Sequence, residues 1–103
     1  MCTAITFHTK DFYFGRNLDL GRSYGEQVTV TPRNYPIHLQ NGDVLNNHYA
    51  MIGMASVING YPLYFDAINE KGLCMAALNF PDNACYYPFV HRRTNITSFE
   101  LIP

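Results

Sequence analysis

Cys2 stands directly after Met1, and its position suggests nucleophilic chemistry. Removal of the methionine, which a small second residue favours, would leave Cys2 with a free α-amine beside its thiol. Because a thiol has a pKa of about 8.5 and an α-amine one of about 7.7 to 8.0, this amine can accept the thiol proton near neutral pH. One residue would then supply both nucleophile and base. A Met-Cys start also arises by chance, so the interpretation depends on other residues.

Three other residues have the chemistry that such a nucleophile requires. A thiolate is favoured by a nearby positive charge, a carboxylate can orient or hold the ammonium group, and an amide can donate to the oxyanion of an attacked carbonyl. A turn at Lys10–Asp11 would bring Arg16 beside Cys2, with Asp19 just beyond it. Asn79 is expected at the end of a later strand, as an oxyanion donor. The plainer alternatives are a surface ion pair between Arg16 and Asp19, and an asparagine that only begins a turn.

The segments that must position these residues are nearly all extended. Residues 3–8 alternate and are rich in β-branched side chains, and residues 12–14 resume the pattern after the turn, which predicts a hairpin with Cys2 at its start. Asn59-Gly60 is a strong signal for a second hairpin. Near-continuous apolar runs after it predict a meander in a sheet that is covered on both faces. The further expected strands are 27–31, a short piece at 37–39, and 50–58, 61–68 and 73–79.

The last residues predict the start of a helix. Thr97 and Glu100 have the spacing of a capping box, in which each side chain bonds the backbone N–H of the other residue. Pro103 follows within one turn, so we expect a truncated chain that stops where a covering helix begins. The alternative is a frayed tail whose likeness to a cap is accidental.

Composition excludes several function classes. With 48% hydrophobic residues, 15% charged residues and a net charge of −1, the chain lacks the basic surface of a nucleic-acid binder. No run is apolar enough to span a membrane, and the first residues lack a secretion signal, which predicts a cytoplasmic location. The three cysteines, Cys2, Cys74 and Cys85, show neither Cys-x-x-Cys spacing nor an even number. We therefore expect neither a disulfide framework nor a zinc site.

Five short blocks stand in a characteristic order along the chain. They are Met1–Thr3, Phe14–Asp19, Val30–Asn34, Asn69–Leu73 and Leu78–Pro81. In this order and approximate spacing the chain resembles the choloylglycine hydrolase family, which contains bile salt hydrolases and penicillin V acylases. The resemblance covers all 103 residues.

This resemblance implies an α+β fold of the N-terminal-nucleophile (Ntn) hydrolase type, with two antiparallel sheets packed between helical layers as an αββα sandwich. The chain would supply mainly strands of it. Residues 1–103 would be the N-terminal part of one such domain, truncated before the helices and the remaining active-site residues. We expect a homo-oligomer in the full-length form.

The resemblance also implies roles for single residues. Cys2 resembles the nucleophile, with its own freed amine as base, Arg16 matches the arginine beside the thiol, and Asp19 matches the aspartate that contacts the nucleophile. Asn79 in Leu-Asn-Phe-Pro looks like the bile salt branch, because a tyrosine usually stands there in the penicillin acylase branch. The implied reaction is hydrolysis of the amide bond of glycine- or taurine-conjugated bile salts through a thioester, without a cofactor.

Leu18 and Ile58 match positions that line an apolar pocket for the sterol body. Ile58 is at least as consistent with plain core packing, and Leu18 with a loop anchor. Two alternative functions remain at this point: a penicillin V acylase-type amidase, and a non-catalytic β-rich fragment that binds apolar ligands. For the 103-residue chain alone we expect little or no hydrolysis.

Overall fold

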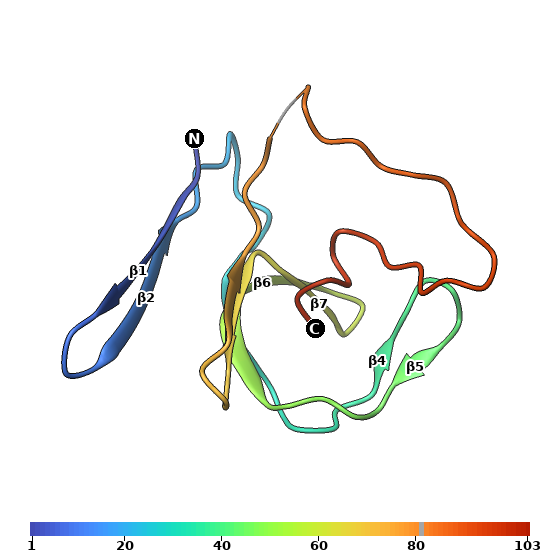
Figure 1. Ribbon diagram of the computed structural model, residues 1–103, viewed down its shortest axis with the longest axis horizontal. Coiled ribbons are helices and arrows are strands. Elements are labelled where there is room, and N and C mark those ends of the chain that lie inside the picture. Colours follow the sequence, from blue (N-terminus) through green and yellow to red (C-terminus); the bar gives the residue numbers. More distant parts are fainter. Residues whose placement is uncertain (81) are drawn as a thin grey trace.

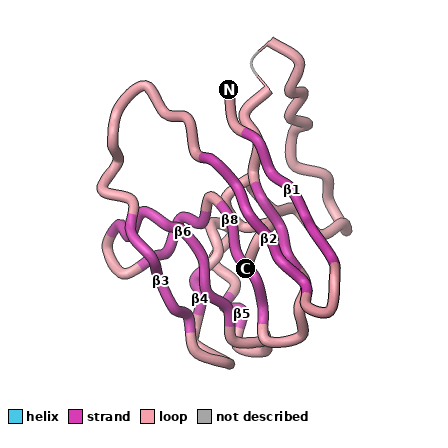
Figure 2. Tube along the Cα trace, turned by 90° about the vertical axis from the view of Figure 1, so that its left-hand side faces the viewer, coloured by secondary structure: helices cyan, strands magenta, loops and turns pink. Residues whose placement is uncertain are grey.

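The computed structural model describes residues 1–80 and 82–103, so the last residue of the 78–81 block lies outside the described residues. The described part contains nine β-strands and no helix (Figures 1 and 2). The strands are β1 (Thr3–His8), β2 (Phe12–Asn17), β3 (Gln27–Thr31), β4 (Ile37–His38), β5 (Val44–Leu45), β6 (Met51–Ile58), β7 (Tyr61–Tyr64), β8 (Asp66–Asn69) and β9 (Cys74–Ala76).

The first two strands form the predicted hairpin, and its register decides which residues meet. His8 pairs with Phe12 next to the turn, and Arg16 pairs with Ala4. Because side chains alternate between the two faces of a strand, one face of the hairpin is more buried than the other. The half-buried positions on this face are Cys2, Ala4, Phe14, Arg16 and Leu18.

A second, larger sheet forms the centre of the molecule. Its strands run in the order β3-β6-β8-β9, and β7 also pairs with β6. The Asn59-Gly60 turn joins β6 to β7 as predicted, and both residues adopt the positive φ values (51° and 79°) that a tight hairpin turn requires. The meander is therefore confirmed, with β3 added at its edge.

A β-bulge at Phe65 divides the predicted strand 61–68 into β7 and β8. The pairs Ala55–Tyr64 and Met51–Asn69 differ in register by one residue, so one extra residue is accommodated between them. Opposite the bulge lies Gly53, where an added Cβ would lie 1.9 Å from the Asp66 carbonyl oxygen. The strands approach this closely because Gly53 has no side chain.

The two faces of this sheet have different neighbours. The core face carries the buried cluster Met51, Ala55, Tyr64 and Ala67, against which Ile102 of the C-terminal segment packs. The β1–β2 hairpin lies on the opposite side, which we call the hairpin face (Figure 1). The register places Val28, Val30, Ile52 and Asp66 on the hairpin face.

Some strand predictions were wrong. β9 ends at Ala76 and not at Asn79, and Leu73 precedes it with 64% of its surface exposed. Val28 and Val30 are also exposed, at 68% and 63%. The expectation of a sheet covered on both faces therefore fails within the described residues, because the narrow hairpin and the C-terminal segment cover only part of each face.

The C-terminal segment forms half of the predicted capping box and no helix. Glu100 reaches back to accept from the Thr97 backbone N–H at 2.6 Å, but the Thr97 hydroxyl has no partner among the described residues. Glu100 also accepts from the Gln40 N–H at 2.6 Å, which ties this segment to the turn between β4 and β5. A short cap without a following helix is too weak to nucleate one, so Thr97–Leu101 remains a turn.

Candidate active site

The thiol of Cys2 lies against the backbone of Asp19. The Asp19 N–H donates to Sγ at 3.5 Å, and Sγ lies 3.8 Å from the Asp19 carbonyl oxygen. Cys2 itself is half-buried. A backbone N–H that points at sulfur favours negative charge there, which is what a thiolate nucleophile needs.

The predicted position of Arg16 directly beside Cys2 was wrong by two residues. Arg16 pairs with Ala4, so continuing the register places Leu18 opposite Cys2. Residues 9–11 connect the strands, so the turn is centred on Lys10, and Cys2 is farther from it along the chain than Arg16 is. Cys2 and Arg16 are consequently diagonal neighbours on one face, at a separation that a long side chain can bridge.

The carboxylate of Asp19 forms an ion pair with the N-terminal ammonium of Met1. This hydrogen bond is the main reason why the pKa of the α-amine is raised from 8.0. With Met1 in place, the nitrogen of Cys2 is an amide and has no basic lone pair. The residue whose carboxylate holds the Met1 ammonium is therefore the same residue whose backbone contacts the Cys2 thiol.

The guanidinium of Arg16 is buried under the hairpin, with 7% of its side chain exposed. Nη2 donates to the Ala77 carbonyl at 2.6 Å, and Nε lies 3.4 Å from Oδ2 of Asp66. Because Ala77 follows β9 and Asp66 begins β8, Arg16 connects the hairpin to the central sheet. The alternative of a surface Arg16–Asp19 pair is therefore wrong, since Arg16 pairs with Asp66 and is not at the surface.

Asn79 lies in an irregular segment beyond β9 and is exposed. It follows Ala77, the residue bound by Arg16, by two positions, so the segment leaves the sheet beside the hairpin. Its role as an oxyanion donor stays a prediction.

The two expected sterol contacts lie in different surroundings. Leu18 is half-buried on the same side of the β1–β2 hairpin as Cys2. Ile58 ends β6 next to the turn and is 54% exposed, so the alternative of plain core packing does not hold for it in the described structure.

Sequence analysis missed Asp66. It is a buried polar residue, with 8% of its surface exposed, and its Oδ1 accepts from the Met54 N–H at 3.0 Å. The available signal was a single acidic residue inside an apolar run, since carboxylates are rarely buried without a partner.

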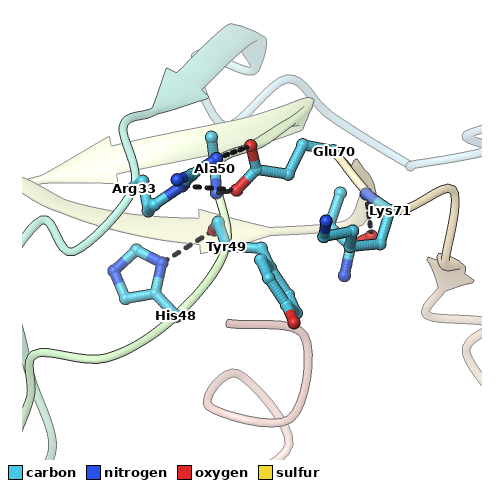
Figure 3. Close-up of polar contacts among 7 residues, drawn as sticks. Arg33, His48, Tyr49, Ala50, Glu70 and Lys71 are labelled. Atoms are coloured by element: carbon cyan, nitrogen blue, oxygen red, sulfur yellow. Dashed lines mark hydrogen bonds and ion pairs between the residues drawn. The ribbon is translucent and has the colours of Figure 1, made fainter.

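A second polar cluster lies at the other end of the sheet and does not include the thiol. It borders a hollow of about 580 Å³, lined among others by Arg33, His48, Tyr49 and Lys71 (Figure 3). Arg33 is neutralised by a two-point ion pair with Glu70, at 2.8 and 2.5 Å, and the Lys71 ammonium lies 5.5 Å from the centre of the Tyr49 ring. Because these cations already have partners, we assign this cluster a role in stabilising the fold.

Neither of two other kinds of site is found in the described part of the chain. No three His, Cys, Asp or Glu residues within 1–80 and 82–103 are grouped to hold a metal ion. None of these residues form a helix long and apolar enough to cross a membrane.

The family was decided by a comparison with protein-family models, in which residues 2–103 match the linear amide C-N hydrolases of the choloylglycine hydrolase family. The chain belongs to this family. Similar proteins include a bile salt hydrolase/transferase of Lactiplantibacillus plantarum, 52% identical over the whole chain and 32% of that protein. A conjugated bile acid hydrolase of Lactobacillus gasseri is 46% identical over 99% of this chain and 33% of that protein.

The fold agrees with that of a solved structure of a similar protein. A conjugated bile acid hydrolase variant from Clostridium perfringens superposes with a TM-score of 0.87 at 35% identity, over 99% of this chain and 32% of that one. The predicted fold class is thereby confirmed, and the all-strand chain is consistent with a part of the Ntn-hydrolase sandwich. The chain spans about a third of the length of the relatives that it matches.

Proposed function

We propose that this chain supplies the nucleophile of an amidase that hydrolyses glycine- or taurine-conjugated bile salts. The observation that carries the proposal is the meeting of the Cys2 thiol with the Asp19 backbone, while the Asp19 carboxylate holds the N-terminal ammonium. The names of the similar proteins, bile salt hydrolase/transferase and conjugated bile acid hydrolase, supply the substrate class.

The proposed reaction has two steps and begins after removal of Met1. The α-amine of Cys2 takes the thiol proton, and the thiolate attacks the amide carbonyl to form a tetrahedral oxyanion that Asn79 helps to stabilise. The C–N bond then breaks, and the amine returns the proton to the departing glycine or taurine. Water hydrolyses the resulting thioester, which frees the bile acid and the thiol.

Recognition of the sterol would depend on apolar area. Leu18 lies opposite Cys2 in the β1–β2 hairpin, and Ile58 would contribute from the end of β6. At about 25 cal/mol per Å² of buried apolar surface, even a partly enclosed sterol gains several kcal/mol. The second candidate is a penicillin V acylase-type amidase. Asn79 makes it the weaker candidate, because a tyrosine usually stands at this position in that branch.

An affinity label tests the proposal without requiring turnover. The probe is the chloromethyl ketone of cholic acid, whose chloride is displaced by a thiolate to give a thioether. After confirmation of the N-terminus by intact mass, we expect labelling of Cys2 ahead of Cys74 and Cys85, with protection by taurocholate. Equal labelling of all three cysteines, or no protection by taurocholate, would contradict the proposal. Protection by penicillin V alone would favour the second candidate.

Hydrolysis itself is the second measurement. Release of taurine from taurocholate by the 103-residue chain is expected to be slow or absent, and any release should disappear in Cys2→Ser. Taurine release that persists in Cys2→Ser would refute the assignment of the nucleophile. A chain that neither labels at Cys2 nor releases taurine, but still binds cholate, would match the non-catalytic alternative.

The wider setting is also proposed. We infer that residues 1–103 form the N-terminal part of a single Ntn-hydrolase domain, that the protein acts in the cytoplasm, and that the full-length form is a homo-oligomer. Fractionation of cells and light scattering of the full-length protein test the last two points.

A further inference from the structure

Asp66 and Arg16 form an ion pair that is almost fully buried. Their side chains are 12% and 7% exposed, and the contact joins Oδ2 to Nε at 3.4 Å. Two buried charges are costly to remove from water, and such a pair persists where its geometry is fixed by further bonds. Asp66 has one in the Met54 N–H, and Arg16 has one in the Ala77 carbonyl.

The bulge at Phe65 explains why Asp66 points toward the hairpin. In an uninterrupted strand, Tyr64 and Asp66 would share a face, because side chains alternate with a period of two. Tyr64 and Ala67, three residues apart, both lie in the core cluster, so the extra residue has reversed the alternation. Asp66 consequently lies on the hairpin face, under Arg16.

The arrangement leaves two nitrogens of the guanidinium without a hydrogen-bond acceptor among the described residues. Nε and Nη1 of Arg16 are both buried, and the 3.4 Å contact of Nε with Asp66 is an ion pair and not a hydrogen bond. Buried donors are nearly always satisfied in folded proteins, so an unpaired one in a site indicates a group that arrives later or a charge that acts at short range. Cys2 is the diagonal neighbour of Arg16 on the same face.

We propose that Asp66 is a positioning residue, which together with the Ala77 carbonyl fixes the Arg16 guanidinium so that its charge acts on the Cys2 thiolate. This inference rests on the proposed function only in treating Cys2 as the catalytic nucleophile. The geometry that it invokes lies within the hairpin with Cys2 at its start, β6, β8 and the residue after β9.

The direction in which the pH–rate profile of Cys2 alkylation shifts distinguishes a positioning role of Asp66 from a direct effect of its charge on the thiol. Removing the negative charge of Asp66 would by itself favour the thiolate of a nearby cysteine, and the pH–rate profile of alkylation would move to lower pH. If Asp66 acts by holding Arg16, its loss releases the guanidinium, and the profile moves to higher pH. Diagonal neighbours in a sheet lie about 7 to 8 Å apart along the backbone, and a unit charge at about that distance in an effective dielectric of about 40 to 80 corresponds to roughly 0.5 to 1 pH unit.

The test is alkylation of Cys2 by iodoacetamide between pH 5 and 10, followed by peptide mass spectrometry so that Cys74 and Cys85 are read separately. In Asp66→Asn the amide oxygen can still accept from the Met54 N–H, while the group that faces Arg16 becomes an uncharged NH2 that cannot accept from the guanidinium. We expect the midpoint of the Cys2 profile to rise by roughly 0.5 to 1 pH unit. The same variant placed in an Arg16→Met background should cause no further rise.

Two controls complete the design. Glu70→Gln removes the other ion pair of the sheet, with Arg33, and should leave the Cys2 profile unchanged. Arg16→Lys keeps the charge but cannot bridge Asp66 and Ala77, so it should raise the midpoint even if Asp66→Asn fails to fold. An unchanged or lowered midpoint in Asp66→Asn, or an equal rise in the Arg16→Met background, would overturn the inference. Because alkylation needs no bile salt, failure of the proposed substrate would leave this result intact.

Discussion

Gly53 offers the sharpest test of how the sheet positions Asp66. An alanine Cβ at this position would lie 1.9 Å from the Asp66 carbonyl oxygen and 2.7 Å from the Ala67 Cα. Both atoms belong to the backbone, so no side-chain rotation can relieve the contact. Gly53→Ala would therefore force β6 and β8 apart at the bulge, by roughly 1 Å if a tolerable contact is to be restored.

The expected cost has two parts. Overpacking of a well-packed site costs about 1 to 3 kcal/mol, and more where backbone must move. Displacement of Asp66 also weakens its pairing with Arg16, and loss of a buried pair costs up to about 3 to 5 kcal/mol. We therefore expect Gly53→Ala to lower the free energy of unfolding by at least about 2 kcal/mol, out of the roughly 5 to 15 kcal/mol typical of a domain.

Urea denaturation followed by circular dichroism measures this loss, with Gly15→Ala as the matched control. Gly15 also lies in a strand, but its added Cβ would meet only the Ile5 Cγ1 at 3.9 Å, an ordinary contact. That variant should be neutral or more stable by up to about 1 kcal/mol, because alanine restricts the unfolded chain. If Gly53→Ala and Gly15→Ala unfold at the same urea concentration, the close approach of β6 and β8 is not a packing constraint, and the account of the bulge is refuted.

Two further predictions concern stability away from the thiol. The hydrogen bond from Arg33, helped by the Ala50 N–H, lowers the pKa of Glu70 from 4.5 to about 2. The stabilisation that ionised Glu70 provides is thus complete above about pH 4.5 and is lost as the pH falls toward 2. The difference in unfolding free energy between the wild type and Glu70→Gln should therefore shrink over that range. A difference that stays constant would refute the assignment. Tyr64→Phe removes the buried 2.7 Å hydrogen bond to the Thr31 hydroxyl and should cost about 1 to 3 kcal/mol in urea denaturation. Adding Thr31→Val should recover part of that loss, since no unpaired hydroxyl then remains, and a further loss would contradict the reasoning.

The strands could be predicted where the local pattern alone decides them. β1 and β3 were predicted with their observed bounds, and the turn after β6 was predicted from Asn59-Gly60. Period-two alternation and an Asn-Gly turn are local sequence signals, so they predict structure without knowledge of the partner strand. The family blocks added the expectation that Cys2 and Asp19 lie close together, and the structure places them in contact.

The remaining features depend on contacts between distant residues. The bulge at Phe65 was not predictable, because the sequence 61–68 reads as one strand and only the packing against Gly53 interrupts it. Glu100 indicated a helix cap, yet one of its oxygens binds Gln40, sixty residues away. Arg16 was placed beside Cys2 although the turn, centred on Lys10, is nearer along the chain to Arg16 than to Cys2, and a change of register moves every facing pair along the hairpin.

Contacts between distant residues also give the candidate site its geometry. Gly53 allows the strands to approach, the bulge at Phe65 turns Asp66 toward the hairpin, and Asp66 then pairs with Arg16. The hairpin register finally places Arg16 diagonal to Cys2. The position of the charge near the thiol is therefore determined by the central sheet as well as by the hairpin that carries both residues. We therefore expect Gly53→Ala to shift the Cys2 alkylation profile to higher pH, the direction expected for Asp66→Asn. The sequence of the hairpin alone does not predict this effect. A variant with a weakened sheet but an unshifted profile would show that the hairpin alone sets the reactivity of Cys2.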